Sequence, residues 1–386
     1  MILQPPSTSI APLLLDEIRR REAKLIERVR ALVEIESPSS DKLTVDHVQS
    51  LFAEWAQAAG GKLRRHRFRE YGDSVEVRFG ERYRREDSIM LLGHLDTVWA
   101  VGTLARMPWR VTRDRIAGPG VLDMKAGVVM ALTAVESLLE LGLLRRPVTL
   151  LIHGDEEVGS LASRGLTEAV ARRSSAVYVL QPLQGDDGAY KTARKAVGVY
   201  RLKVTGVAAH SGVDFELGHS AIVELARQIE VLHSLTDSSR RITVNPGVIG
   251  GGTRANVVAA EAWVQIDLRI ARKQDVARMD RAMHALKPFD KACKLAVKGG
   301  INRPPMERTP GAAALFRRAR AFAAQLGTQL EEASTGGGSD GNFTSALGIP
   351  TLDGMGAVGA GAHAPHEHLI RKHLAPRTAI LAAMLI

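Results

Sequence analysis

The chain has few of the residues that mark several large classes of protein. Cys293 is the only cysteine among 386 residues, so no disulfide can form within the chain, which fits a reducing compartment. No apolar run approaches the roughly 18 residues of a membrane span. The first residues, Met1 to Asp16, lack a basic leader, and Leu13–Leu15 is shorter than the apolar core of about 7–15 residues found in secretory signals. We therefore expect a soluble, cytoplasmic protein without a membrane partner.

Recognisable nucleic-acid motifs are also lacking, although the formal net charge is +10. Lysine and arginine crowd between Lys62 and Arg85. Such charge is compatible with a basic nucleic-acid binder, but this stretch has few aromatic side chains to stack on bases. Solvated edge strands explain it equally well, since positive charge discourages edge-to-edge pairing of sheets. We favour the edge strands and expect no nucleic-acid partner.

The length and composition indicate a globular protein of two domains. A chain of 386 residues exceeds one typical hydrophobic core, and 45% hydrophobic with 24% charged residues is an ordinary globular balance. The pattern of elements predicts a first domain formed by residues 1–195 and 306–386. Residues 196–305 then form a second domain, inserted into the first.

The first domain shows alternating helical and strand patterns. Apolar spacing predicts helices over residues 12–34, 42–59, 128–139 and 312–326, and strands over residues 62–69, 74–79, 89–92, 148–152 and 177–180. Gly60-Gly61 is a typical helix terminator. This alternation predicts an α/β fold with a mixed, mostly parallel sheet and helices on both faces, whose sites form at the carboxyl ends of the strands.

The inserted segment has a different order of elements. Strand patterns occur over residues 199–204, 242–249, 262–269 and 294–297, and helical patterns over 222–232 and 274–286. The order strand-helix-strand-strand-helix-strand predicts a small α+β domain of the ferredoxin-like kind.

Histidine and acidic residues follow the predicted strands of the first domain. His94 follows the apolar run Ile89–Leu92, and Asp96 lies on the same side of an extended chain. This pair suits a metal ligand with a supporting carboxylate, and it equally suits an ordinary turn. Asp123, in a glycine-rich turn before a helix, is either a ligand or a helix N-cap. The consecutive acids of residues 155–157 have no such simple structural explanation.

Together these residues favour a metal site. His94, Asp123, Glu156, Glu157 and His363 offer two imidazoles and several carboxylates, more than one ion requires. Paired divalent ions that share a carboxylate are typical of hydrolases of amides and phosphates. Of two adjacent acids, one can bind the metal while the other activates water as general base.

Five motifs in this order resemble a known family. They are His94-Leu95-Asp96-Thr97-Val98, Gly118-Pro119-Gly120 through Asp123-Met124-Lys125, Asp155-Glu156-Glu157-Val158-Gly159-Ser160, Ala209-His210-Ser211-Gly212 and Ala362-His363-Ala364-Pro365. They are similar to the zinc-dependent aminoacylase and carboxypeptidase superfamily over nearly the whole chain. The spacing and the segment Tyr190–Lys195 look most like the bacterial glutamate carboxypeptidase branch.

The resemblance implies a role for each matching residue. His94 would bind one metal ion, His363 and Glu157 the other, and Asp123 would bridge them. Asp96 would orient His94, and Glu156 would be the general base. His210 falls where the family has a histidine of the lid and dimerisation domain that reaches the active site of a partner subunit. Asn256 and Arg269 match positions that hold the substrate carboxylate; without the family, these three residues read as a turn histidine, a turn asparagine and an exposed strand residue.

Gln181 departs from the family pattern. The family has an acid at this position as a ligand of the His94 metal ion, and an amide oxygen carries no charge and binds zinc less well. We therefore expect a weak second metal site, a different ion or reduced activity. Asp186 and Asp187 follow in a loop and are candidates to replace the missing acid.

The leading hypothesis is a homodimeric, glutamate carboxypeptidase-like hydrolase with two divalent ions, zinc first, with cobalt or manganese as alternatives. Its substrate would be an N-acyl amino acid or a short peptide. The competing hypothesis is a family member whose altered metal site leaves it mainly a binding or regulatory protein. Retention of Glu156, Asp123 and both histidines favours the enzyme.

Overall fold

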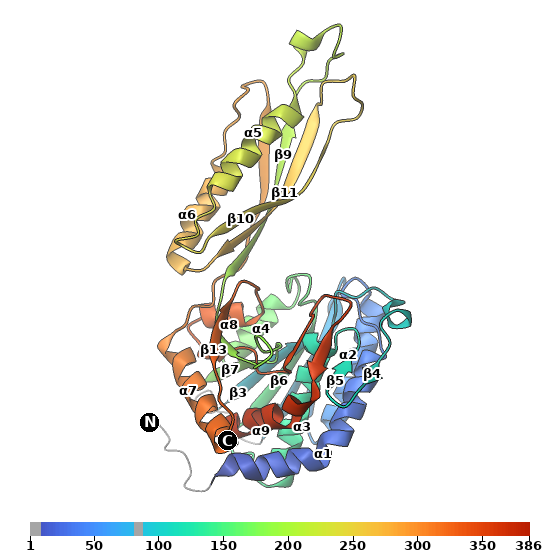
Figure 1. Ribbon diagram of the computed structural model, residues 1–386, viewed down its shortest axis with the longest axis vertical. Helices are drawn as coiled ribbons and strands as arrows, with labels where there is room; N and C mark the ends of the chain where they lie inside the picture. Colours follow the sequence, from blue (N-terminus) through green and yellow to red (C-terminus); the bar gives the residue numbers. More distant parts are fainter. Residues whose placement is uncertain (1–8, 81–87) are drawn as a thin grey trace. The chain divides into compact units, whose positions relative to one another are not determined.

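The computed structural model describes residues 9–80 and 88–386, which form two compact units (Figure 1). Of the described residues, unit 1 contains 9–80, 88–193, 308–335 and 339–386, and unit 2 consists of Arg194–Glu307 and Gly336–Gly338. The described residues do not include residues 1–8, which belong to the segment Met1 to Asp16 compared above with secretory signals. They also do not include residues 81–85 of the basic stretch between Lys62 and Arg85.

Unit 1 contains the following elements. Its helices are α1 (Ile10–Val33), α2 (Lys42–Ala58), α3 (Ala126–Glu140), α4 (Arg164–Ala171), α7 (Pro310–Gln325), α8 (Gly341–Ala346) and α9 (Leu374–Met384), with short helical turns at Thr103–Ala105, Val121–Lys125 and Arg371–His373. Its strands are β1 (Lys62–His66), β2 (Gly72–Phe79), β3 (Ile89–His94), β4 (Arg110–Val111), β5 (Arg115–Ala117), β6 (Val148–Gly154), β7 (Ala176–Val179), β8 (Tyr190–Arg194), β13 (Glu332–Thr335), β14 (Thr351–Leu352), β15 (Gly359–Ala360) and β16 (His368–Ile370).

The main sheet of unit 1 has the strand order β1-β2-β6-β3-β7-β14. Strands β6, β3, β7 and β14 run parallel, whereas β2 and β1 continue the sheet in antiparallel fashion. This strand order places β3 in the interior of the sheet, between β6 and β7. The predicted mixed, mostly parallel sheet is therefore confirmed, and the carboxyl ends of β3, β6 and β7 lie at one edge.

Helices cover both faces of this sheet. Alternate residues of β3 enter different apolar clusters: Ile89 and Leu91 pack with residues of α1, α2, α3 and α9, whereas Met90 and Leu92 pack with residues of α4. A strand buried on both faces must be apolar at every position, and β3 and β6 are buried along their entire lengths. The two-sided packing fixes the sheet rigidly at the point where the polar residues follow.

Several elements form where local sequence signals placed them. Asp41 caps α2, because its carboxylate accepts hydrogen bonds from the backbone N–H groups of Leu43 and Thr44. The helix stops before Gly60, whose φ of 87° is a left-handed conformation that favours glycine. Strand β1 is an edge strand with Lys62 and Arg64 exposed, which confirms the edge-strand interpretation for this part of the basic stretch.

Other elements were not predicted from the sequence, chiefly α4, α8 and the short strands. The small sheet β15-β16-β5-β4 and the pair β13-β8 consist of strands of two to five residues. The strand expected over residues 62–69 ends at His66. Short strands carry too few residues to show a period of two, so tertiary pairing alone defines them.

None of the helices within residues 9–80 and 88–386 has both the length and the apolar character needed to cross a bilayer. Helix α1 has 24 residues, and its buried positions include Leu14, Ile18, Leu25 and Val29. These residues recur at helical spacing between charged ones, as expected for an amphipathic helix that packs on a core.

Unit 2 is an antiparallel sheet with helices on one face. Its elements are β9 (Ala196–Thr205), α5 (Ala221–Ser234), β10 (Thr243–Gly251), β11 (Glu261–Ile270), α6 (Lys273–His284) and β12 (Lys294–Arg303), with a short helical turn at Phe215–Leu217. The strand order is β10-β11-β9-β12, and every pair is antiparallel. Burial alternates along β9 and β11, and the buried side chains pack with Leu225, Leu232, Met279 and Met283 of α5 and α6. The predicted ferredoxin-like α+β fold is confirmed.

Candidate metal centre

The polar residues at the carboxyl edge of the unit 1 sheet come together. His94 is the last residue of β3, Glu156 and Glu157 follow β6, and Gln181 follows β7. Asp123 lies in the helical turn Val121–Lys125, directly before α3, and His363 follows β15. Segments far apart in sequence therefore deliver side chains to one place, because the central strands are parallel and end at the same edge.

Asp123 does not cap α3. The residue at the N-cap position of α3 is Lys125, without a side-chain capping hydrogen bond. The carboxylate of Asp123 instead faces two imidazoles, with Oδ1 at 3.3 Å from His94 Nε2 and Oδ2 at 3.6 Å from His363 Nε2. The N-cap alternative is therefore wrong.

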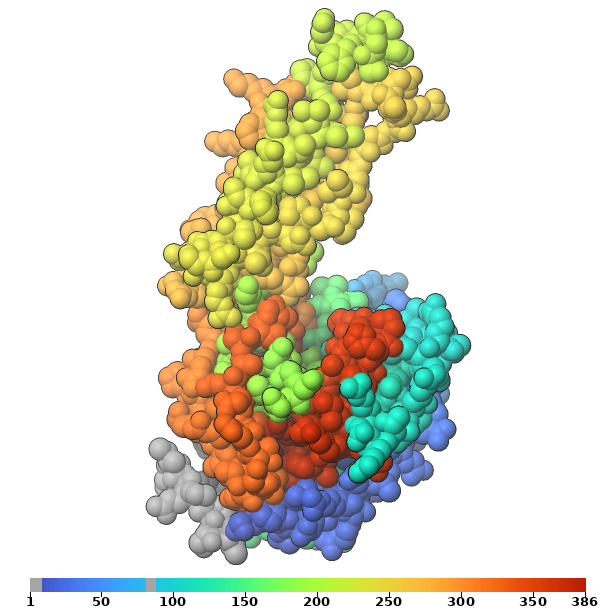
Figure 2. Space-filling view, in the orientation of Figure 1, coloured from blue at the N-terminus to red at the C-terminus, as the bar shows by residue number. Residues whose placement is uncertain are grey.

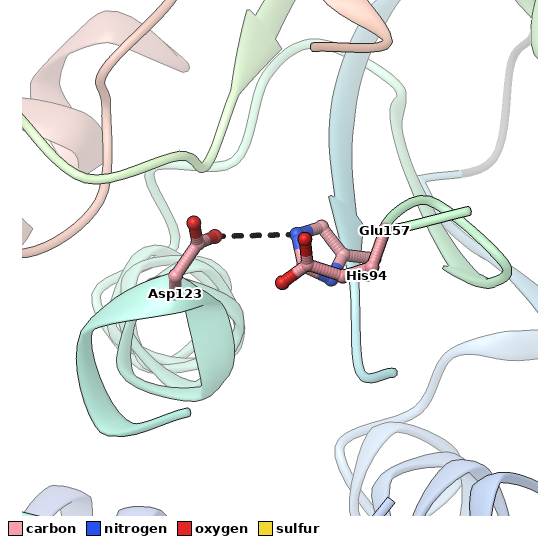
Figure 3. Close-up of side chains that lie close together, drawn as sticks. All are labelled: His94, Asp123 and Glu157. Atoms are coloured by element: carbon pink, nitrogen blue, oxygen red, sulfur yellow. Dashed lines mark ion pairs between the residues drawn. The ribbon is translucent and has the colours of Figure 1, made fainter. Parts of the chain in front are cut away.

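Figure 3 shows His94, Asp123 and Glu157 facing one another. One nitrogen of His94 and one oxygen from each acid lie within 4.8 Å of one another. The His94 side chain is 1% exposed, and Asp123 and Glu157 are 13% and 8% exposed. Asp123 Oδ1 accepts no well-aligned hydrogen bond from any described residue. A buried carboxylate oxygen without a donor fits a metal ion, because buried charges are normally paired or bound to metals.

His363 and Glu157 form the other half of the cluster. His363 Nε2 lies 3.2 Å from each oxygen of Glu157, and the imidazole is half exposed. The backbone φ of His363 is 63°, an uncommon left-handed conformation for a residue other than glycine. The His363 ring lies close to the carboxylates of Glu157 and Asp123.

The charges of the cluster shift the pKa values of its members. Burial lowers the pKa of His94, but its contacts with Asp123 and Asp96 outweigh burial, and the pKa lies well above the usual value. Contacts with Asp123 and Glu157 raise the pKa of His363 to about 10. Burial raises the pKa of Glu157 against the effect of His363. Histidine must be neutral to bind a metal ion, so a dication between these groups would compete with protons for the two imidazoles.

Asp96 supports the cluster from behind. Its carbonyl oxygen lies 3.0 Å from His94 Nδ1, and its carboxylate lies 3.4 Å from the same nitrogen. The carboxylate also accepts hydrogen bonds from the backbone N–H groups of Glu156 and Glu157 and from the Ser39 hydroxyl. A donor bond from Nδ1 leaves Nε2 of His94 to bind a metal, and Asp96 fixes the acidic loop at the same time.

Gln181 occupies the remaining side of His94. Its side-chain nitrogen lies 3.1 Å from His94 Nε2, and the residue is 7% exposed. A half-turn of the amide would bring its oxygen to the same place, since the two orientations have nearly the same shape. Asp186 and Asp187 are exposed, and the metal-binding cluster found among the described residues does not include them.

The donor set fits divalent metal ions. Two imidazoles, several carboxylates and an amide converge from the ends of β3, β6, β7 and β15 and from the turn before α3. Imidazole and carboxylate together suit zinc, cobalt and manganese. Glu156 lies beside this set, with one oxygen 3.9 Å from His94 Nε2 and a side chain that is 10% exposed.

Unit 2 carries the other residues predicted from the sequence. His210 and Asn256 lie on adjacent exposed loops, since the Ser211 N–H donates to the Asn256 carbonyl and His210 is paired with Val257. Figure 2 shows the yellow-green loop that follows β9 projecting from this end of unit 2. Arg269 lies near the other end of β11, where its guanidinium pairs with Asp267.

The length of strand β11 separates Arg269 from the loop that carries Asn256. Glu261, at the end of β11 near Asn256, is eight residues from Arg269, which corresponds to about 26 Å along an extended strand. Asn256 and Arg269 of one chain therefore cannot hold the same small carboxylate. His210 and Asn256 thus lie on adjacent loops at one end of the sheet, and Arg269 lies near the other end of β11.

One buried residue of the site, Glu367, was not predicted from the sequence. Glu367 is 1% exposed, and its carboxylate accepts hydrogen bonds from the turn that carries Asp123. An acidic residue four positions after His363, in an otherwise uncharged loop, was the available signal.

Comparison with known proteins identifies the chain's relatives. The sequence pattern of peptidase family M20/M25/M40 matches residues 90–386. The chain is 30% identical to carboxypeptidase G2 of Pseudomonas sp. over 306 residues, which cover 78% of this chain and 73% of the relative. It is 31% identical to a putative succinyl-diaminopimelate desuccinylase DapE of Mycobacterium tuberculosis over 273 residues, covering 67% and 71%.

Solved structures share the fold at low identity. The aminopeptidase PepT of Bacillus cereus has a TM-score of 0.77 and 20% identity, covering 94% of this chain and 98% of its own. The M20 family metallo-carboxypeptidase Sso-CP2 of Sulfolobus solfataricus has a TM-score of 0.75 and 16% identity, covering 94% and 98%. YxeP of Bacillus subtilis, described as a dinuclear metal-binding peptidase of the M20 family, has a TM-score of 0.69 and 15% identity, covering 95% and 98%.

The family match spans most of the chain and includes every residue of the cluster described above. The relatives at about 30% identity cover two thirds or more of the chain. The resemblance indicated by the five sequence motifs is confirmed, and the chain belongs to peptidase family M20/M25/M40, a family of hydrolases.

Proposed function

We propose that this chain is a metal-dependent hydrolase that cleaves the amide bond of an N-acyl amino acid or a short peptide, with two divalent ions, zinc first. The observation that carries the proposal is the position of Asp123 between two imidazoles. Its two oxygens face His94 and His363 separately, at 3.3 and 3.6 Å. A carboxylate shared in this way suits a pair of ions rather than a single one.

Two subsites follow from this geometry. His94 and Gln181 would hold one ion, His363 and Glu157 the other, and Asp123 would bind both. The His363 subsite has its own carboxylate, whereas the His94 subsite has only the shared one. Because an amide oxygen carries no charge, we expect the ion at His94 to be bound more weakly.

Glu156 is the proposed general base. Bound divalent ions supply Lewis-acid activation of water and of the substrate carbonyl. Glu156 takes the proton of the attacking water and delivers it to the leaving nitrogen, which requires a carboxylate near the ligands that does not itself bind an ion. Its 10% exposure and its 3.9 Å distance from His94 are compatible with that task. The backbone N–H of Glu156 donates to the Asp96 carboxylate, which anchors the segment that carries the base.

The substrate class is supported by the relatives and by Arg269. One relative is named a carboxypeptidase and another a putative desuccinylase, and both names imply amide substrates that carry a carboxylate. Arg269 offers a guanidinium that can bind a carboxylate in bidentate fashion after releasing Asp267. We assign the carboxylate of the substrate to Arg269.

A homodimer forms part of the proposal. Glu261, at the end of β11 that leads to the loops of His210 and Asn256, lies about 26 Å from Arg269 along the strand, so we propose that a second subunit brings all three residues to one substrate. The end of unit 2 that carries His210 also exposes apolar side chains, namely Val213, Phe215, Leu217, Ile222, Val223 and Ile249. Apolar residues gathered on a surface, beside the edge strand β10, are typical of a protein interface.

The site of action is proposed to be the cytoplasm. Its only support is that the single cysteine, Cys293, is buried and has no partner for a disulfide within the chain. Fractionation of cells with an antibody against the chain tests the assignment. Recovery in a membrane or extracellular fraction would contradict it.

A hydrolysis screen tests the enzyme proposal. Purified protein is assayed on N-acyl amino acids and dipeptides with zinc, cobalt or manganese, and the bound metal is measured on the same sample. We expect turnover that a chelator abolishes and that metal restores. Metal binding without turnover on any amide would favour the alternative, a binding or regulatory protein with an altered metal site.

A further inference from the structure

Glu367 connects three segments that carry candidate metal ligands. Its Oε1 accepts hydrogen bonds from the backbone N–H groups of Leu122, at 2.9 Å, and Asp123, at 3.1 Å. Its Oε2 accepts from the Gly120 N–H at 2.9 Å and from the Trp99 indole N–H at 2.8 Å. One buried carboxylate therefore receives four donors from two different segments.

The third segment is the one that contains Glu367 itself. The loop from Gly361 to Glu367 is closed by two turns, in which the Ala364 N–H donates to Gly361 and the Glu367 N–H donates to Ala364. His363 lies inside this loop with its left-handed backbone. Anchoring the carboxylate of Glu367 therefore anchors the loop that presents His363.

The segments joined in this way carry ligands of both subsites. Trp99 lies five residues after His94, Gly120 directly precedes the helical turn Val121–Lys125, and Leu122 lies within that turn beside Asp123. Metal affinity depends on ligands that are already in place, since each ångström of displacement must be reversed on binding. A single acceptor common to three ligand-bearing segments is well placed to set the spacing of the subsites.

We propose that Glu367 is a positioning residue of the metal centre, which holds the His94, Asp123 and His363 segments in register through its four accepted hydrogen bonds. The proposal rests on the metal-dependent function proposed above. Glu367 is not a ligand in this account, because both its oxygens are occupied by N–H donors. Its contribution is to metal affinity rather than to the chemical step.

A purely structural role is the competing explanation. A buried carboxylate that satisfies N–H groups before α3 would stabilise the fold whether or not metal binds. The two roles differ in what they predict for metal affinity. A structural anchor changes the melting temperature alone, whereas a positioning residue also changes the dissociation constants of the ions.

The variant Glu367→Gln distinguishes the positioning role from the purely structural role without creating a cavity. The amide keeps the shape of the side chain but replaces one accepting oxygen by an NH₂ group, which then faces N–H donors in either orientation. Metal-stripped variant and wild type are titrated with zinc and with manganese by calorimetry, and their melting temperatures are measured without metal. We expect the affinity for both ions to fall by about 10- to 100-fold, the usual effect of losing an outer partner of metal ligands.

Glu224→Gln is the matched control. Glu224 in unit 2 is also a buried carboxylate that accepts backbone N–H groups, from Phe289 and Asp290, but it joins no candidate metal ligands. We expect this variant to lower the melting temperature and to leave metal affinity unchanged. If Glu367→Gln behaves in the same way, the positioning role is wrong.

Trp99→Phe keeps the test decisive if Glu367→Gln does not fold. It removes one of the four donors and retains an aromatic ring, so a smaller loss of metal affinity is expected. Unchanged affinity in this variant would then overturn the proposal. Wild-type protein that takes up no metal would overturn both this proposal and the metal-dependent function. If wild type binds two ions and Glu367→Gln binds them with the same affinity, only the positioning role of Glu367 is wrong, and the metal-dependent function still stands.

Discussion

The two units bury their polar residues in different ways. In unit 1 the central strands are covered on both faces, and their carboxyl ends carry ionisable groups that are almost entirely buried, including His94, Asp96 and His153. In unit 2 the sheet is covered on one face, burial alternates along β9 and β11, and His210 and Asn256 are exposed on loops.

This difference indicates which unit performs the chemistry. Burial of charged groups costs free energy unless each has a partner, so a cluster such as that of unit 1 is retained where its chemistry is needed. Exposed polar residues cost almost nothing and are available to a substrate or a second subunit. The difference supports the proposal that unit 1 carries metal binding and the reaction, and that unit 2 carries recognition and association.

The largest effect is expected at the base in unit 1. Glu156→Gln should lower turnover by about 10²–10⁴-fold, because the other carboxylates of the cluster are proposed to bind metal or to orient His94 and so cannot replace the base. Metal content should stay unchanged, as measured by elemental analysis beside the hydrolysis assay. Glu54→Gln, which removes an exposed acid of α2, is the control and should retain full activity. Loss of metal from Glu156→Gln would mean that base and ligand are exchanged in our assignment.

The next effect tests whether an exposed residue of unit 2 takes part in the reaction. His210→Ala should lower turnover by about 10²–10³-fold with little change in substrate affinity, because a donor to the developing oxyanion acts mainly in the transition state. His233→Ala, an exposed histidine of α5 in the same unit, is the control and should be silent.

Mixing variants then shows which subunit His210 serves. His210→Ala and Glu156→Gln are each nearly inactive, but their mixed dimer contains one site with an intact base and an intact partner histidine. Random exchange makes about half of the dimers mixed, so activity should recover towards about a quarter of wild type. If exchange occurs and nothing is restored, His210 acts within its own subunit or has no catalytic role.

A smaller effect is expected at Gln181, the uncharged member of the buried cluster. Gln181→Glu should tighten the weaker of the two ions by about 10-fold, because an added charge beside a dication outweighs its own desolvation by ~1.4 kcal/mol. Metal titration of both forms measures this change. Gln184→Glu adds the same charge on an exposed loop and is the control. Equal affinities in wild type and Gln181→Glu would show that the amide binds the ion adequately.

The smallest effect concerns the acids of unit 2. Arg240 and Arg278 lower the pKa of Asp275 below its usual 3.8. A group whose pKa is lower in the folded state contributes stability above the unfolded value, and loses it as the pH falls through the folded one. Asp275→Asn should therefore lower the melting temperature slightly at pH 7, and by less near pH 3, because part of the contribution is lost as the pH falls below 3.8. Glu230→Gln, an exposed acid of α5, should be neutral at both values, and an equal loss from Asp275→Asn at both values would contradict the assignment.

Much of the fold could be predicted because the local patterns are strong. Continuous apolar runs such as Ile89–Leu92 indicate strands buried on both faces, and alternation along residues 199–204 indicates a sheet covered on one. The short strands β15 and β16 could not be predicted, because two or three residues show no period and β16 pairs with β5, which is distant in sequence. Helix α4, of eight residues, was not predicted either.

For the site, the sequence by itself determined the kinds of side chain and the strand ends that carry them. Strand-end residues such as His94 and Glu157 can be found in this way because parallel strands end at one edge of a sheet, whatever the details of packing. Only the tertiary structure decided that Asp123 faces two imidazoles instead of capping α3, and that Gln181 lies against His94. Only the tertiary structure showed that Glu367 joins three ligand-bearing segments. Hydrogen bonds between residues some 245 positions apart leave no periodic signal in a sequence, so they cannot be predicted from it.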